Sequence, residues 1–189
     1  FAATASWSNE FVDATPLRFG DIDGDGKSDV CAARGKALWC ARSNGSGFSR
    51  ARPWLESVDQ SWLASFVLGD LDGNGAADVC GRSRTGISCA LSGGTSFGVL
   101  REWAQAGDFG DTNAQLLLGD LNGDGHADLC APSGTRTLCA FSTASAFLRS
   151  SSWSESVAAG DRVFGDVNGD GRADSCGATP DGIMCEVAP

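Results

Sequence analysis

Residues 20–31 read GDIDGDGKSDVC, and closely similar phrases return at residues 69–80 (GDLDGNGAADVC), 119–130 (GDLNGDGHADLC) and 165–176 (GDVNGDGRADSC). Successive copies lie 49, 50 and 46 residues apart. Self-similarity at a nearly constant period is the signature of a repeat architecture, in which each unit buries its apolar face against the next. The sequence therefore predicts four copies of one structural unit.

Each unit contains short segments with the features of β-strands. They are rich in apolar, β-branched and aromatic residues, are bounded by Gly, Asn, Asp and Ser, and show no helical periodicity. In the second unit we expect four strands, at about 66–69, 78–82, 86–91 and 97–103. Four strands per unit are typical of a propeller blade. We therefore predict an all-β fold, a single four-bladed β-propeller domain over residues 1–189, with repeats at about 8–54, 55–103, 104–153 and 154–189 plus 1–7.

A recurring aromatic pair indicates how the ring would close. A Phe is followed six residues later by a Trp in three of the units, and the fourth unit lacks this pair. Phe1 and Trp7 have the same spacing at the other end of the chain. We expect the N-terminal segment to supply the outer strand of the last blade, because such closure removes exposed sheet edges. The three internal pairs are Phe48/Trp54, Phe97/Trp103 and Phe147/Trp153.

The eight cysteines form four local pairs, with the second Cys nine residues after the first. Turn residues lie between them, so each pair would face across two antiparallel strands, within reach of a disulfide. Zinc is the alternative, but it would need ligands gathered from several repeats. We predict four disulfides and, from the even cysteine count, an oxidising compartment. The predicted pairs are Cys31–Cys40, Cys80–Cys89, Cys130–Cys139 and Cys176–Cys185.

Each repeated phrase contains an acidic loop, Asp-x-Asp/Asn-x-Asp/Asn-Gly-x-x-Asp. Side-chain oxygens at positions 1, 3, 5 and 9, with the main-chain carbonyl at position 7, can surround one hard cation, and the Gly at position 6 permits the sharp turn. Calcium takes six to eight oxygen ligands, so we predict about four Ca²⁺ ions, one per repeat. The candidate ligands are Asp21, Asp23, Asp25, Lys27 and Asp29; Asp70, Asp72, Asn74, Ala76 and Asp78; Asp120, Asn122, Asp124, His126 and Asp128; and Asp166, Asn168, Asp170, Arg172 and Asp174.

These loops differ from an EF-hand. Position 12 is Ala or Gly rather than Glu, and the loop continues into a strand-like segment, so the Asp at position 9 must close the site. Magnesium suits such a flexible all-protein cage less well. The loops hold 13 of the 24 acidic residues, and four bound Ca²⁺ would move the net charge from −10 to about −2. We expect stability to depend on calcium; simple Asn/Asp/Gly turns are the alternative reading.

The loop and its Gly-Asp lead-in resemble the FG-GAP (VCBS-type) repeat. That resemblance implies a calcium-binding propeller of the kind found in integrin α-chain heads, in propeller lectins and in modules of secreted bacterial enzymes. Residues 34–48, with RGKALW and NGSGF, also resemble the strand-turn-strand unit of mushroom propeller lectins. Those relatives usually carry seven blades, and most lack a disulfide in each blade. Four repeats then imply either a small ring or half of a larger ring built by two chains.

Several functional classes are disfavoured by composition. A net charge of −10 argues against a nucleic-acid partner, no apolar run is long enough to span a membrane, and we expect any export signal to have been removed. The only His, His126, lies in a loop, and no Cys is spare as a nucleophile. We therefore expect no enzyme, although a glycosidase pair remains open among the carboxylates outside the loops, which include Glu10, Asp13, Glu56, Asp59, Glu102, Asp108, Asp111, Glu155, Asp161 and Glu186.

The six tryptophans are the candidate ligand contacts. Four recur once per repeat and are followed by polar or acidic residues, an arrangement that suits a sugar ring but equally suits packing between blades. Two break the repeat pattern and are the better candidates for an exposed contact. The recurring set is Trp7, Trp54, Trp103 and Trp153; the other two are Trp39 and Trp62.

Together these features predict a secreted, calcium-dependent binding module. A glycan is the leading ligand, partly because repeated sites suit multivalent binding. A protein-adhesion module of the integrin-head kind is the alternative, and a glycan-active enzyme is a more distant one. We expect a monomer or a homodimer, with no nucleic-acid partner and no membrane insertion.

Overall fold

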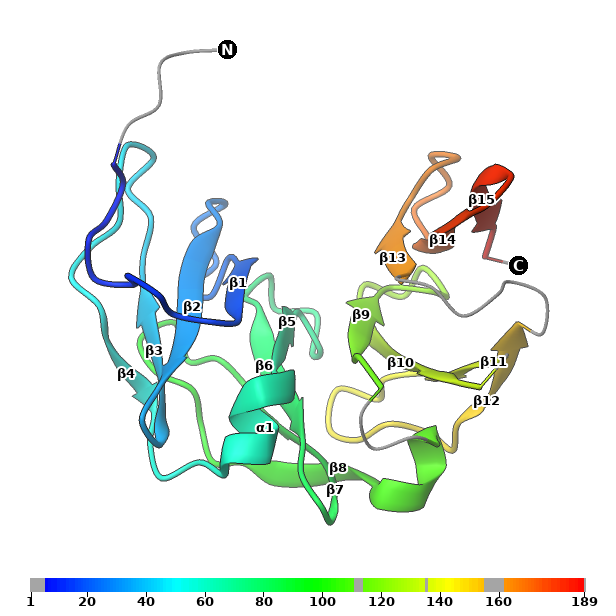
Figure 1. Cartoon of the computed structure of the whole chain (residues 1–189), viewed down its shortest axis with the longest axis horizontal. Helices are drawn as coiled ribbons and strands as arrows, with labels where there is room; N and C mark the ends of the chain where they lie inside the picture. Colours follow the sequence, from blue (N-terminus) through cyan, green and yellow to red (C-terminus); the bar gives the residue numbers. More distant parts are fainter. Residues whose placement is uncertain (1–5, 111–113, 135, 155–161, 189) are drawn as a thin grey trace.

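The computed structural model describes residues 6–110, 114–134, 136–154 and 162–188, and its strands form four antiparallel sheets. The sheets follow one another around an arc, each with its first strand innermost (Figure 1). The all-β propeller architecture with four blades is thus confirmed. Each repeat forms one blade, and the apolar side chains of a blade are covered by the neighbouring blade.

The first two blades have four strands each, in sequence order. Their core lies between the sheets, where the Trp of one blade packs on the Phe of the next: the Trp54 and Phe97 ring centroids lie 5.4 Å apart. Blade 1 consists of β1 (Leu17–Gly20), β2 (Asp29–Arg34), β3 (Ala37–Ala41) and β4 (Arg52–Leu55), and blade 2 of β5 (Val67–Gly69), β6 (Asp78–Arg82), β7 (Gly86–Ala90) and β8 (Arg101–Gln105).

Blade 3 repeats this pattern, whereas blade 4 has three described strands. Trp103 of blade 2 packs on Phe147 of blade 3, with ring centroids 5.2 Å apart, so the second junction matches the first. Blade 3 consists of β9 (Leu117–Gly119), β10 (Asp128–Ser133), β11 (Arg136–Ala140) and β12 (Ser151–Ser154), and blade 4 of β13 (Arg162–Gly165), β14 (Asp174–Thr179) and β15 (Gly182–Glu186).

The four predicted disulfides are confirmed. In each blade the two cysteines face each other on the second and third strands, with Cα atoms 4.1 Å apart. Each disulfide therefore joins neighbouring strands inside one blade, and none connects two blades.

Two short helices were not expected. Both lie in the segments that connect one blade to the next: α1 (Gln60–Ser65) and the 3₁₀ turn η1 (Ala106–Phe109). Asp59 caps α1 by accepting a hydrogen bond from Ser61 N at 2.8 Å. With six and four residues, these helices are too short to produce a readable apolar periodicity.

The strand boundaries expected in blade 2 agree with the structure for the first three strands. The fourth strand begins later than expected, at Arg101 instead of residue 97. Phe97 forms only an isolated bridge with Ser92, and its N–H donates to Trp54 O of blade 1 at 3.1 Å. Phe97 therefore contacts the neighbouring blade and does not extend β8, although phenylalanine favours β-strands.

The expected closure of the ring by the N-terminal strand is not confirmed. Trp7 does occupy the place of an outer-strand Trp: its carbonyl accepts a hydrogen bond from Phe48 N at 3.1 Å, as Trp54 O does from Phe97 N. However, Trp7 does so beside blade 1, whereas blade 4 lies at the other end of the open arc (Figure 1). Phe1 lies outside the described residues.

Candidate functional site

The first aspartate of each acidic loop organises the loop backbone. Asp21 Oδ1 accepts hydrogen bonds from Gly24 N and Asp25 N at 2.8 and 3.0 Å, and Asp21 Oδ2 accepts one from Gly26 N at 2.6 Å. Gly26 has φ = +84°, a conformation that side-chain-bearing residues rarely adopt. The same three bonds recur at Asp70, Asp120 and Asp166, so all four described loops share one conformation.

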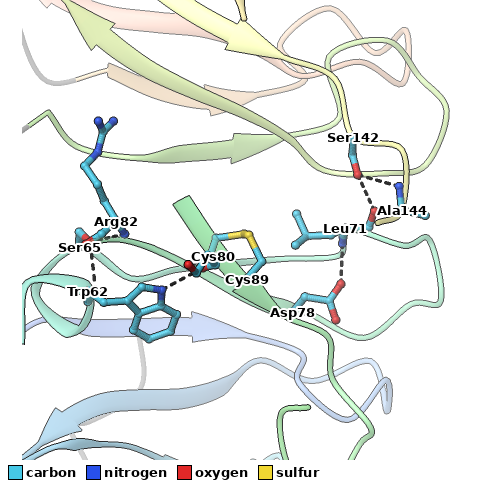
Figure 2. Close-up of a disulfide and its surroundings, with 10 residues drawn as sticks. Trp62, Ser65, Leu71, Asp78, Cys80, Arg82, Cys89, Ser142 and Ala144 are labelled. Carbon is cyan, nitrogen blue, oxygen red and sulfur yellow. Dashed lines mark hydrogen bonds between the residues drawn. A yellow bond between two sulfur atoms is a disulfide. The ribbon is translucent and has the colours of Figure 1, made fainter. Parts of the chain in front are cut away.

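The ninth-position aspartate is fully buried in every loop. Asp78 Oδ2 accepts a hydrogen bond from Leu71 N at 2.9 Å, and its Oδ1 accepts one from Ser92 N at 2.6 Å (the first is drawn in Figure 2). Burial raises the pKa of Asp78 to about 6, and the nearby Asp72 and Asp70 carboxylates add to the shift. The pKa of Asp128 is raised to about 6 for the same reasons. Unshielded carboxylate charge is therefore costly here.

Carboxylate oxygens converge in the first two loops. One ligand oxygen from each of three aspartates lies within 4.8 Å of the others in loop 1 and again in loop 2. Asp23 Oδ1 is buried and has no hydrogen-bond partner, as expected of an oxygen that a cation would satisfy. These oxygen-only donor sets suit a hard cation such as calcium. The two sets are Asp21, Asp23 and Asp29, and Asp70, Asp72 and Asp78.

The other predicted side-chain ligands are engaged within their loops. Asp25 pairs with Lys27 Nζ at 2.8 Å, and in loop 3 the amide of Asn122 donates to Asp124 Oδ2 at 2.9 Å. The fifth-position oxygen accepts from the N–H of position 7 in each loop, which keeps it beside the site but not in the converging set. Loops 1 and 2 thus have the more complete carboxylate sets among the described residues.

Neighbouring loops are linked through the backbone. Ala77 N donates to Asp21 O at 2.6 Å, so the loop of blade 2 is tied to that of blade 1. Blade 3 is tied to blade 2 in the same way by Ala127 N, which donates to Asp70 O at 2.6 Å. At both junctions a serine hydroxyl adds a second bond: Ser92 Oγ donates to Ile22 O at 2.6 Å, and Ser142 Oγ donates to Leu71 O at 2.8 Å (the latter in Figure 2). A cation held by one loop would therefore also stabilise the junction with the next blade.

The ring of His126 lies against the preceding loop: a Cβ placed on Gly73 would be 2.8 Å from His126 Cδ2. Its Nδ1 is buried without a hydrogen-bond partner. The sequence showed the place of His126 in the loop but not this contact, which depends on how neighbouring blades meet.

Three tryptophans belong to the core. Trp54, Trp62 and Trp103 are 3%, 1% and 5% exposed. Trp62, one of the two better candidates for an exposed contact, instead donates its Nε1 hydrogen bond to Ser88 O at 2.9 Å and packs so closely on Gly81 that a Cβ there would be 2.5 Å from the indole. The expectation for Trp62 is wrong because α1 turns its ring into the space between two blades.

The remaining tryptophans keep some exposed surface. Trp7 is 45% exposed, and Trp39 and Trp153 are half-buried. The Arg34 guanidinium lies 5.1 Å from the Trp39 ring centroid, and Trp153 contacts Phe141 edge-on. Among the described tryptophans, these three are the ones that could contact a ligand.

A cavity of about 740 Å³ lies between blades 1, 2 and 3. It is next to the first residue of β5 and the last residue of β6, at the end of the blade opposite the acidic loops, which follow β5 and precede β6. Sequence reasoning missed it because its wall combines residues from three repeats. The cavity is lined by Arg18, Arg82 and Arg84, by Ser61, Ser65, Ser83 and Gln115, and by Ala64, Val67, Ala114 and Leu116.

The lining combines positive charge with apolar surface. Arg18 lies 5.9 Å from the Phe66 ring centroid, and Arg82 lies at the end of β6, where Figure 2 shows its side chain extending away from Trp62. No carboxylate lines the cavity among the described residues. Guanidinium, hydroxyl and amide donors beside an apolar wall suit a polar or anionic small molecule.

Comparison with known proteins supports the repeat and the fold. Residues 21–81 match the model of the FG-GAP-like repeat. No curated protein matches the sequence of the chain. Within the described residues, no helix is long and apolar enough to cross a membrane.

Solved structures share the blade arrangement at low sequence identity. An N-acetylglucosamine-recognising lectin from Agrocybe aegerita has a TM-score of 0.73 and 18% identity, covering 91% of this chain and 49% of that one. The Photorhabdus luminescens Tc holotoxin pore has a TM-score of 0.67 and 20% identity, covering 96% of this chain and 9% of that one. The chain therefore spans half or less of these proteins, and at these identities the likeness establishes the fold alone.

Proposed function

We propose that this chain is an extracellular, calcium-binding propeller module that binds carbohydrate and catalyses no reaction. The main support for ligand binding is the cavity between blades 1, 2 and 3. Its lining combines three arginines and several neutral hydrogen-bonding groups with apolar side chains. Sugars offer both hydroxyls and apolar ring faces, so such a lining complements them. The lectin with the same blade arrangement is consistent with this role.

Calcium is proposed for the acidic loops, with a structural role. Asp21, Asp23 and Asp29 would hold one ion in loop 1, and the matching aspartates one in loop 2, with loops 3 and 4 as further sites. The bound ion would supply positive charge that neutralises clustered carboxylates. Because the cavity lies at the opposite end of the blades, calcium is proposed to shape the protein and not to touch the sugar.

The extracellular location is proposed from the disulfides. All eight cysteines are paired, one disulfide per blade. Such bonds persist in oxidising compartments and are rare in the cytosol.

A glycan array tests the proposal, using the labelled protein in calcium and again in EDTA. We expect selective binding to one sugar family and at least about tenfold weaker binding by Arg84→Ala or Gln115→Ala, since each removes hydrogen-bond donors from the cavity. Arg101→Ala, which removes the same charge from an exposed site on β8, is the matched control and should bind as the unmodified protein does.

Two results would contradict the proposal. A stably folded, calcium-loaded protein that binds no glycan would favour a protein-docking module of the same fold. Glycan binding that is unchanged in both cavity variants would show that the sugar binds elsewhere, with Trp7, Trp39 and Trp153 as the next residues to substitute.

A further inference from the structure

The two ends of the arc carry the two halves of an interface that the chain already forms three times. At the junction of blades 1 and 2, a Cβ on Gly20 would lie 3.1 Å from Ala77 Cβ and 3.2 Å from Leu68 Cβ. The junction of blades 3 and 4 repeats this, with Gly119 against Ala173 at 2.9 Å and Phe164 at 3.3 Å. We call the glycine side of a blade its trailing face and the opposite side its leading face.

No described residue covers the trailing face of blade 4 as the next blade covers the other trailing faces. No atom lies within 4 Å of a Cβ built on Gly165. Val167 is 58% exposed, whereas its counterparts Ile22, Leu71 and Leu121 are at most 1% exposed. Apolar side chains that the fold buries at three blades are thus open to solvent at the fourth.

The third strand of blade 4 shows the same contrast. Ile183 is 78% exposed, whereas Leu38 and Ile87, at the same place in blades 1 and 2, are 0% and 1% exposed. Met184 beside it is 52% exposed. In the other blades an outer strand pairs with this third strand, while β15 has no described partner on that side.

The leading face of blade 1 is the complementary half. Phe19, the counterpart of Leu68 and Phe164, is 59% exposed. Trp7 takes the place of the outer-strand Trp of a preceding blade, yet among the described residues no blade stands behind it. Blade 1 thus offers an aromatic side chain and an outer strand, neither of which is present beside blade 4 in the described part of the chain.

Charge also matches at this pair of faces. In the chain, the position-7 side chain of one loop lies over the fourth-position Gly of the preceding loop: Arg172 Cγ would be 3.4 Å from a Cβ on Gly123. Lys27 holds position 7 on the leading face of blade 1. It would face Gly169 in loop 4, which carries three aspartates. Opposite charges would therefore meet.

From these contacts we propose that the leading face of blade 1 docks on the trailing face of blade 4 of a second copy of this chain. Phe19 of one copy packs over Gly165 of the other, and the Trp7 segment adds as the fourth strand to the edge of β15 that has no strand partner among the described residues. Strand addition supplies main-chain hydrogen bonds, and the apolar contacts repeat those inside each chain. The association is head-to-tail, so each copy retains one face for another partner.

Analytical ultracentrifugation of the full chain in calcium tests this. The mean mass of the unmodified protein should rise with concentration. Phe19→Asp removes the leading face and Ile183→Asp the trailing face, and each variant alone should associate at least about tenfold more weakly, because a charge would be buried in an apolar contact. Val99→Asp, at a side chain 78% exposed in the β7–β8 connection and on neither face, should associate as the unmodified protein does.

A mixture provides the sharper measurement. Phe19→Asp keeps an intact trailing face and Ile183→Asp an intact leading face, so equal amounts of the two should form a one-to-one complex that grows no further. Circular dichroism verifies that both variants are folded. An unmodified protein that stays monomeric at high concentration would overturn the proposal, as would a mixture of folded variants that remains monomeric.

Discussion

At the scale of the residue, one glycine per repeat limits how closely two blades can approach. The Gly of the first three Gly-Asp lead-ins faces the next blade, where its missing side chain leaves room for an Ala and a Leu or Phe. None of the four lead-in glycines has a positive φ, so a turn does not require them. What requires a glycine at the junctions is the close contact between repeats. The repeated glycine in the sequence therefore marks the position where neighbouring blades come into contact.

This leads to a prediction with an internal control. Gly119→Ala places a methyl group 2.9 Å from Ala173 Cβ, which cannot swing away, so we expect unfolding free energy to fall by about 1–3 kcal/mol. Gly165→Ala makes the same change at the equivalent position of blade 4, where nothing lies within 4 Å, and should change stability by less than about 1 kcal/mol.

Urea unfolding of dilute protein in calcium measures both variants. Equal destabilisation by the two substitutions would show that the loss comes from the backbone or the unfolded chain and not from the crowded junction. The dilute condition keeps any contact between copies out of the comparison.

At the scale of the element, the sequence predicted what is local and missed what joins blades. The loops, the facing cysteines and three of the four strands of blade 2 follow from residue types at fixed spacing. The late start of β8, the burial of Trp62 by α1 and the cavity at Arg84 depend on which blades become neighbours and at what angle. The sequence pattern carries no information about that angle, so it cannot tell whether the side chain of an aromatic residue such as Trp62 is exposed or buried.

The disulfides give an element-scale prediction. The bond between Cys80 and Cys89 is fully buried in blade 2, whereas Cys185 of blade 4 is exposed. Because thiol–disulfide exchange requires access to sulfur, mild reductant should open the Cys176–Cys185 bond first. Alkylation followed by mass spectrometry would reveal the order, and equal reduction rates in all four blades would contradict the exposure seen for β15.

At the scale of the whole molecule, the acidic loops form one coupled series. Backbone hydrogen bonds of 2.6 Å connect the loop of each blade to that of the next, from loop 1 to loop 4. These four loops contain more than half of the acidic residues of the chain, whose net charge is −10. Cations bound there would relieve repulsion within each loop and also brace the three junctions, so calcium is expected to act on the cooperativity of the whole arc.

The buried ninth-position aspartates predict that protein stability depends on pH in opposite directions with and without calcium. In EDTA, Asp78 and Asp128 have a pKa of about 6 in the folded protein against an ordinary value of 3.8, so the folded state holds extra protons between these values. Their contribution to stability is full below pH 3.8 and is lost as the pH rises through about 6. Calcium requires the charged carboxylates, so its stabilisation should instead grow over the same range.

Thermal unfolding at pH 5 and pH 7, in EDTA and in millimolar calcium, measures this. We expect the gain from calcium to be the larger at pH 7, and Asp78→Asn to reduce both that gain and its pH dependence, since an amide neither titrates nor matches the charge of a carboxylate ligand. Magnesium at the same concentration should stabilise less. A gain that is equal at both pH values would mean that the buried ninth-position aspartates take no part in holding the ion, and an equal gain for the two metals would mean that the loops do not select calcium.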